Sequence, residues 1–206
     1  MATDPSVTLP TFRRPVFHIV LTRLGERRRF IQVLAGPRQV GKTTLARQVL
    51  AAVPLGWHYA SADDPGFRTR AWLETQWDIA RMKATDGGRG GAVLIVDEIQ
   101  KIPAWSDLVK RLWDEDTRTG TRLKAVLLGS APWLIDHGLT ESLAGRFEIV
   151  RVPHWSFSEM RAAFAVTTPD RSSRIRRCSA SCRMPNTTTL AHYLRCLLYT
   201  SPSPRD

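Results

Sequence analysis

Short apolar segments alternate with amphipathic ones over the first 166 residues of this chain. Five segments have the length and composition of β-strands, and the third and fourth are apolar almost throughout. They are residues 30–35 (FIQVLA), 56–64 (GWHYASADD), 92–97 (AVLIVD), 123–130 (LKAVLLGS) and 147–152 (FEIVRV). The last one alternates between apolar and polar positions, which is typical of a strand at or near the edge of a sheet.

Helical periodicity occupies the spaces between these strands. The pattern predicts helices over residues 42–52, 70–84 and 105–116, and a last helix that opens near Ser156. Ser156 is followed three residues later by Glu159, which is the spacing of a capping box. Residues 1–28 are expected to form an N-terminal extension and a helix. Strands that alternate with helices indicate an α/β domain, which we place at residues 29–166.

The periodic pattern ends near Thr167. Residues 167–206 have no usable period and no sizeable apolar face, which is typical of a disordered basic tail. A second interpretation is that this segment is not native protein. Its end, 196–206 (CLLYTSPSPRD), can be obtained by translating a string that resembles a transposase-type sequencing adapter, so we exclude it from fold reasoning.

Composition and charge restrict the class of protein. No apolar run approaches the roughly 20 residues that span a bilayer, and the N-terminus has no secretory signal pattern, so we expect a cytoplasmic protein with no membrane partner. The formal net charge is +11, but residues 167–206 contain seven Arg and two Asp and contribute +5 of it. A nucleic-acid partner is therefore only weakly supported. All three cysteines also lie in 167–206, without the spacing of a zinc site or a disulfide framework.

A phosphate-binding loop follows the first strand directly. Residues 36–43 (GPRQVGKT) fit the pattern G-x-x-x-x-G-K-[ST], called the P-loop or Walker A motif, between a strand and a helix. In such a loop, backbone N–H groups point at phosphate oxygens, the lysine adds a point charge, and the hydroxyl coordinates Mg²⁺. The predicted nucleotide-binding residues are Gly36, Pro37, Arg38, Gln39, Val40, Gly41, Lys42, Thr43 and Thr44.

Two acidic residues end the third predicted strand. In P-loop proteins the strand-end acid, here Asp97, holds Mg²⁺ and helps to neutralise the phosphates. The predicted metal-binding residues are therefore Thr43 and Asp97. Glu98 is placed to polarise an attacking water, which is the arrangement of hydrolytic ATPases. A kinase for a small molecule uses a substrate hydroxyl instead, so Glu98 disfavours that alternative.

Two further residues are candidates for catalysis together with Glu98. Ser130 ends the fourth predicted strand, where a hydroxyl can hold the lytic water or sense the γ-phosphate; a simple strand-ending turn is the alternative. Arg146 precedes the fifth strand. It is expected to contact phosphate in cis, or to serve a neighbouring subunit as an arginine finger, unless it is an ordinary surface residue.

The order and the residues of these motifs resemble those of a prokaryotic family. The segments GPRQVGKTTL, VDEIQKIPAW, LLGSAPWLIDHGLTESLAGR and VPHWSFSEM are similar to AAA+-superfamily ATPases with an AAA_14-type domain, which a DUF4143 domain normally follows. The resemblance covers roughly residues 13–166. It implies a P-loop NTPase (AAA+-like) three-layer α/β sandwich with a mostly parallel central sheet, in which one strand lies between the P-loop strand and the acidic strand. It also implies ATP as the nucleotide, since the N/T-K-x-D motif that reads guanine is absent.

The family also predicts what should follow SFSEM, namely a GG[YF]P turn and later an RWR element. Neither is present. A one-base shift of the reading frame can yield Phe-Gly-Gly-Ala-Pro across residues 175–180 and an Arg-rich stretch containing Arg-Trp-Arg across residues 184–192. We therefore interpret the chain as truncated, with the native frame lost between about residues 167 and 174.

Taken together, the sequence predicts an ATP-binding protein that is an Mg²⁺-dependent ATPase. Its nucleotide state would act on a protein partner, on self-association or on the C-terminal region. The alternative is an ATP-gated module that binds nucleic acid or protein with little turnover.

Overall fold

The computed structural model describes residues 9–86, 90–130 and 143–164. The chain divides into two units, residues 1–166 and 167–206, and every described residue belongs to the first. The predicted frame shift and the adapter-like end therefore lie outside the described residues. So do residues 131–142, which carry part of the family motif that ends at Arg146.

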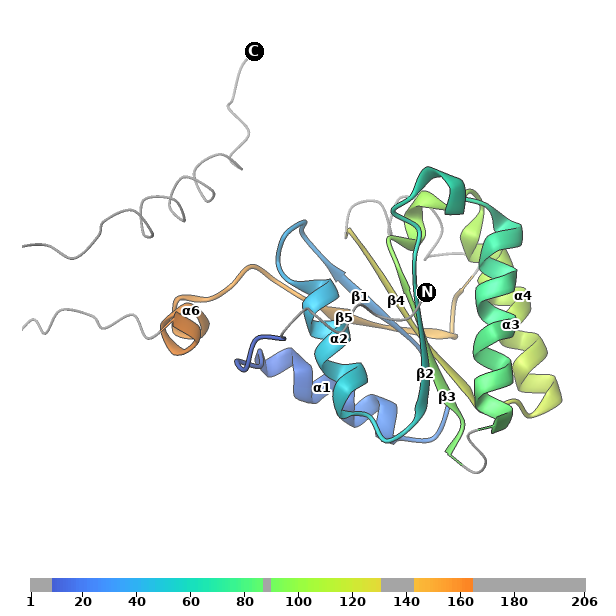
Figure 1. Cartoon of the computed structure of the whole chain (residues 1–206), viewed down its shortest axis with the longest axis horizontal. Helices are drawn as coiled ribbons and strands as arrows, with labels where there is room; N and C mark the ends of the chain where they lie inside the picture. The colour runs from blue at the N-terminus through green and yellow to red at the C-terminus, as the bar shows by residue number, and fades with distance from the viewer. Residues whose placement is uncertain (1–8, 87–89, 131–142, 165–206) are drawn as a thin grey trace, which may run out of the picture. The chain divides into compact units, whose positions relative to one another are not determined.

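A five-stranded sheet forms the centre of the unit (Figure 1). Its strands are β1 (Ile31–Gly36), β2 (Gly56–Ser61), β3 (Ala92–Asp97), β4 (Leu123–Ser130) and β5 (Phe147–Arg151). The strand order is β2-β3-β4-β1-β5 and every pairing is parallel. The predicted strand between the P-loop strand and the acidic strand is β4, so this expectation is confirmed.

Helices cover both faces of the sheet (Figure 1). They are α1 (Pro15–Gly25), α2 (Lys42–Ala52), α3 (Arg70–Asp86) and α4 (Trp105–Thr119). A further helix, α6 (Phe157–Phe164), belongs to neither core and has no buried residue, and two short 3₁₀ turns, η1 (Pro65–Phe67) and η3 (Ile99–Lys101), complete the described elements. The core on one face joins the sheet to α1 and α2, and the core on the other face joins it to α3 and α4. The expected three-layer α/β sandwich is therefore confirmed.

The central strands are apolar because helices cover both faces of the sheet. Every residue of β1 and β3 is buried, as expected for parallel strands that have helices on both faces. Side chains of β1 alternate between the two cores: Val33 faces α3 and α4, whereas Leu34 faces α1 and α2. The two edge strands, β2 and β5, retain exposed positions, such as Ile149 in β5.

Most element ends lie close to their predicted positions. The second strand is shorter than predicted, because it ends at Ser61 and the carboxylate of Asp64 then caps the turn η1. The predicted capping box of the last helix is confirmed: the backbone N–H of Glu159 donates to Ser156 Oγ at 3.2 Å, and the N–H of Ser156 donates to Glu159 Oε2 at 2.8 Å.

The parallel arrangement brings the carboxyl ends of all strands to the same side of the sheet. We call this side the carboxyl edge and the opposite side the amino edge; both run across the strands, unlike the edge strands β2 and β5. Gly36 at the end of β1 pairs with Ser130 at the end of β4, and Asp97 ends β3. Ligands of open α/β sheets bind at this edge, so the fold itself gathers the predicted site. None of the described helices is long and apolar enough to cross a membrane.

Candidate nucleotide-binding site

Glycines allow the P-loop to turn tightly between β1 and α2. Gly41, which caps α2, has φ of 87°, a left-handed conformation that glycine adopts without steric cost. Gly36 is required for a different reason: a Cβ built there would lie 2.0 Å from the carbonyl oxygen of Val152. This close approach arises because the N–H of Val152 donates to the carbonyl of Ala35 at 2.8 Å, which extends the β1–β5 pairing past the strand end.

The side chain of Lys42 is folded onto the P-loop. Its Nζ donates to the carbonyl oxygens of Gly36 at 2.9 Å and Pro37 at 2.6 Å, and the residue is buried. Burial lowers the pKa of the ammonium, and the nearby carboxylates of Glu98 and Asp97 partly oppose that shift. Both carbonyls belong to residues 36–43, the predicted phosphate-binding loop, so the ammonium lies against the loop itself.

Thr43 and Asp97 are joined by a hydrogen bond across the site. Thr43 Oγ1 donates to Asp97 Oδ2 at 2.6 Å, and the hydroxyl of Tyr59 donates to the same oxygen at 2.9 Å. The other oxygen, Oδ1, accepts from the N–H of Glu98 at 2.9 Å. Three donors therefore fix the orientation of this buried carboxylate. Desolvation raises the pKa of the Tyr59 phenol, and the charge of Asp97 adds to that shift, so Tyr59 remains a donor.

Sequence reasoning missed Tyr59. The residue lies in the predicted second strand, but its contact with Asp97 depends on the pairing of β2 with β3, in which Ser61 lies beside Asp97. A hydroxyl two residues before the end of a strand that neighbours the acidic strand is the signal that could have identified it.

Glu98 adopts a left-handed conformation with φ of 54°, which is uncommon for a residue with a side chain. Its Oε2 accepts from Gln100 Nε2 at 2.6 Å and lies 3.7 Å from Lys101 Nζ. Lys101 also pairs with Asp63, which follows β2. The candidate water-activating carboxylate is thus held by η3 in this conformation.

A cavity of about 450 Å³ opens where these groups meet. It is lined by Arg38, Gln39, Gly41, Lys42, Thr43, Asp63, Glu98 and Lys101. The described residues include no group of three or more His, Cys, Asp or Glu side chains that could cage a metal. Mg²⁺ needs no such cage, because it keeps several waters and binds through one or two protein oxygens and substrate phosphates. The hard oxygens of Thr43 and Asp97 fit that requirement.

Ser130 is buried at the tip of β4, and its Oγ has no hydrogen-bond partner among the described residues. A buried hydroxyl without a partner is costly, unless a water or ligand completes it. Because Val96 pairs with Leu127, Ser130 extends past the level of Asp97 on the neighbouring strand. The contact of Ser130 with water or a γ-phosphate stays a prediction.

Arg146 is not brought to the P-loop. Its carbonyl accepts from the N–H of Ile31, the first residue of β1, whereas the P-loop follows the last residue of that strand. The guanidinium instead pairs with Asp114 of α4, with Nε and Nη2 donating at 2.7 and 3.0 Å. Arg146 thus lies at the opposite edge of the sheet, and the expectation of a phosphate contact in cis is wrong for this conformation. The arrangement leaves open a role toward a second subunit.

A second cavity, of about 320 Å³, lies beside the P-loop on the α2 side. Its lining is mostly apolar and consists of Pro10, Thr11, Phe12, Arg14, Gly41, Thr44, Leu45, Gln48, Trp155, Ala163 and Phe164. The rings of Phe12 and Phe164 lie 5.7 and 5.9 Å from that of Trp155. Sequence reasoning predicted Thr44 here but missed the aromatic residues, because they come from both ends of the unit.

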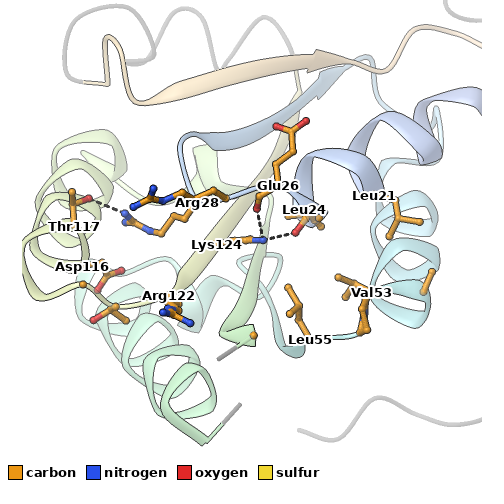
Figure 2. A pocket seen from close by; sticks show the side chains of 17 residues that line it. Leu21, Leu24, Glu26, Arg28, Val53, Leu55, Asp116, Thr117, Arg122 and Lys124 are labelled. Atoms are coloured by element: carbon orange, nitrogen blue, oxygen red, sulfur yellow. Dashed lines mark hydrogen bonds between the residues drawn. The ribbon is translucent and has the colours of Figure 1, made fainter. Parts of the chain in front are cut away.

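A larger cavity, of about 980 Å³, lies at the amino edge of the sheet (Figure 2). None of the predicted site residues lines it. Lys124 Nζ donates there to the carbonyls of Leu24 and Glu26 (Figure 2). Arg28 Nη2 donates to the carbonyl of Trp113 at 3.0 Å. Lys124 therefore satisfies carbonyls at the C-terminal end of α1. Arg28 binds a carbonyl inside α4. Both cations hold backbone groups, so we assign this cavity no catalytic role.

The parallel sheet with β4 between β1 and β3, together with a P-loop that leads into α2, defines a P-loop NTPase of the AAA+ type. Residues 28–161 match the AAA_14 family, an AAA domain. The match covers more than half of the chain, so the chain belongs to this family, as its motifs predict. It is therefore a nucleotide-binding AAA+ ATPase in general terms.

Comparison with solved structures finds similarity to a chain from work on the structural basis for katanin self-assembly. The identity is 21% and the TM-score is 0.49; the match covers 70% of this chain and 53% of that one. The match thus spans about half the length of the katanin-study chain. No curated protein sequence matches this chain.

Proposed function

We propose that this protein binds ATP with Mg²⁺ and hydrolyses it to ADP and phosphate. The observation that supports this best is the hydrogen bond between Thr43 and Asp97 beside Lys42, with Glu98 at the same cavity. A cation, a hydroxyl, a metal-binding carboxylate and a second carboxylate are the groups that phosphoryl transfer to water requires.

In this proposal the P-loop holds the phosphates. Backbone N–H groups of residues 38–44, in the loop and the first turn of α2, bind the phosphate oxygens, and Lys42 exchanges its loop carbonyls for the β- and γ-phosphates. Thr43 and Asp97 would hold Mg²⁺, which when bound neutralises phosphate charge.

We assign the base to the apolar cavity beside the P-loop. Thr44 and Leu45 connect this cavity to the start of α2, and the ring of Trp155 offers a surface on which a purine can stack. The amide of Gln48 donates to the carbonyls of Pro10 and Phe12 at 2.8 and 2.9 Å, which fixes the N-terminal wall. With no guanine-reading motif in the sequence, we propose ATP rather than GTP.

For hydrolysis, the hydrogen bond between Gln100 and the carboxylate of Glu98 must break. Once released, its carboxylate accepts a proton from the attacking water, and Ser130 Oγ is available to hold that water or the γ-phosphate. A slow basal rate is expected, because Gln100 holds Glu98 and Arg146 pairs with Asp114 instead of reaching the P-loop. We propose that assembly or a partner protein supplies the missing positioning groups, with Arg146 serving a neighbouring subunit.

The test compares ATP binding and phosphate release by the full chain with those of two variants. We expect Lys42→Ala to lose most of its ATP affinity, and Glu98→Gln to keep the affinity while phosphate release falls by at least about 100-fold. Lys110→Ala, on α4 and outside the site, is the control. Wild-type binding by Lys42→Ala would exclude this site.

The hydrogen bond from Gln100 to Glu98 also favours a second candidate, an ATP-gated binding module with little turnover. In that function ATP changes the affinity for a nucleic acid or a protein. Binding of labelled DNA at low salt, with and without ATP, tests the nucleic-acid form. DNA binding that requires ATP while phosphate release stays negligible would favour the module over the enzyme.

A further inference from the structure

Arg14 connects three separate segments near the P-loop. The residue directly precedes α1 and is only 4% exposed. Nη1 donates to the carbonyl of Val40 at 3.1 Å, and Nη2 donates to the carbonyl of Pro153 at 3.1 Å. Nε and Nη2 also bind the two oxygens of Glu159, at 2.8 and 3.3 Å. One guanidinium therefore binds the P-loop, the segment after β5, and α6.

The carbonyl of Val40 accepts hydrogen bonds from two side chains outside the P-loop. Besides Arg14, the indole Nε1 of Trp155 donates to it at 3.2 Å, and the guanidinium lies 5.1 Å from the centre of the Trp155 ring. Val40 directly precedes Gly41, which has a left-handed conformation and is the N-cap residue of α2. The position of this carbonyl therefore affects the loop whose N–H groups would face phosphate.

Glu159 is fixed at the other end of the network. One of its oxygens accepts from the N–H of Ser156 at 2.8 Å and the other binds Arg14 Nε, so a single side chain caps α6 and receives Arg14. Displacement of α6 would leave the buried guanidinium without its counter-ion. The cost of a buried, unpaired charge is high, so Arg14 would have to shift with α6 and release Val40.

We infer that Arg14 is a positioning residue that couples nucleotide binding at the P-loop to docking of α6 against it. The inference rests on the proposed nucleotide-binding function and adds the element through which that site is regulated. Docked α6 holds the P-loop in its binding conformation. By linkage, bound nucleotide holds α6 in place to the same degree.

Lysine cannot replace arginine in this role. Arg14 uses three nitrogens in three directions within one plane, whereas an ammonium is a single point of charge on a flexible stem. Arg14→Lys keeps the positive charge but loses the simultaneous contacts to Val40 and Glu159. Glu159→Gln keeps the shape of the partner but removes its charge and one of the two oxygens that accept from Arg14 and Ser156.

The test measures affinity for a fluorescent ATP analogue with the full chain. We expect Glu159→Gln and Arg14→Lys each to weaken binding by roughly 5- to 10-fold. Glu159 carries the test, because it lines neither the phosphate cavity nor the cavity assigned to the base, whereas Arg14 lines the second of these. Glu74→Gln is the matched control, because Glu74 forms an exposed ion pair with Arg111 between α3 and α4, and its affinity should equal that of the wild type. A double variant should lose little more than either single one.

Hydrogen exchange of the α6 amides gives a second readout that a purely stabilising role would not produce. Bound nucleotide should slow exchange across residues 157–164 in the wild type and have a much smaller effect in Glu159→Gln. If the wild type binds the analogue and Glu159→Gln binds it equally well, with unchanged protection of α6, the coupling is wrong and nucleotide binding stands. If the wild type fails to bind, the proposed function and the coupling both fail.

Discussion

Thr43 donates its hydroxyl proton to Oδ2 of Asp97 at 2.6 Å, and this bond joins the first turn of α2 to the end of β3. The two residues lie 54 positions apart in the sequence. Their contact exists because the strand order brings the carboxyl ends of β1 and β3 to the same edge of the sheet, on either side of β4. Substitution of one residue of this pair tests directly whether the site binds Mg²⁺.

Thr43→Val should abolish the effect of Mg²⁺ on nucleotide affinity. Valine keeps the shape of threonine but offers no oxygen to the metal and no donor to Asp97. We expect affinity for an ATP analogue in Mg²⁺ to fall at least about tenfold, to the level of the wild type in EDTA. Thr43→Ser, which retains the hydroxyl, should behave as the wild type does. Equal Mg²⁺ dependence in Thr43→Val and the wild type would contradict this assignment.

Tyr59→Phe should destabilise the fold slightly and loosen the carboxylate of Asp97. The phenol donates one of the three hydrogen bonds to that carboxylate, so its removal should lower the free energy of unfolding by about 1 kcal/mol. Urea unfolding measures this change. In addition, a higher Mg²⁺ concentration should be needed to strengthen binding of an ATP analogue. If neither quantity changes, Tyr59 does not orient Asp97.

Gly36→Ala should disrupt the turn between β1 and the P-loop. The added Cβ would lie 2.0 Å from the carbonyl oxygen of Val152, so backbone must move, and we expect a loss of at least about 2 kcal/mol in stability. Gly25→Ala is the matched control: no atom lies within 4 Å of its built Cβ, and alanine favours the helix in which Gly25 lies. Thermal unfolding of both variants checks the contrast, and similar losses in the two would refute the steric explanation.

The five strands and the loop between β1 and α2 were predicted correctly because these features are local. Buried parallel strands read as apolar runs, and the P-loop pattern is contiguous, so neither needs knowledge of the tertiary structure. The strand order was available only through family resemblance. The end of β2 was predicted too late, because the acidic residues after Ser61 form a turn rather than extend the strand.

Residues whose role depends on tertiary contacts were harder to predict. Arg146 follows a family motif, yet the direction of β5 places it at the edge away from the P-loop, and local sequence carries no information on that direction. Arg14 and Trp155 lie 141 positions apart in the sequence, and only folding brings both to the carbonyl of Val40. Single-residue roles of this kind follow from the topology, not from a motif.

Arg146 can be tested for a role toward a neighbouring subunit by mixing variants. If it acts in trans, Arg146→Ala and Lys42→Ala should each release little phosphate alone. Mixed oligomers would pair an intact P-loop with an intact arginine at some interfaces and recover part of the activity. Arg111→Ala removes another exposed arginine that is paired with a carboxylate, and should remain active. Full activity of Arg146→Ala alone would exclude an arginine finger at this position.

The ion pair between Arg14 and Glu159 should make stability depend on pH in the acid range. The hydrogen bond from Arg14 lowers the pKa of Glu159 to about 2, from an ordinary value of 4.5. A carboxylate whose pKa is lower in the folded state stabilises the fold fully above its unfolded pKa, and that contribution is lost as the pH falls toward the folded value. The pair should therefore contribute fully at pH 7, less at pH 4 and little near pH 2.

Urea unfolding of the wild type and Glu159→Gln at several pH values isolates this contribution, because other titrations cancel in the difference. At pH 7 we expect the variant to be less stable by about 1–2 kcal/mol, as for a hydrogen bond to a charged group. The difference should shrink steadily between pH 5 and pH 2. Glu74→Gln, which breaks an exposed pair, should change stability by less than about 1 kcal/mol. A constant difference from pH 7 to pH 2 would mean that Glu159 does not owe its stabilising effect to its charge, and would leave Arg14 without the counter-ion that the coupling to α6 requires.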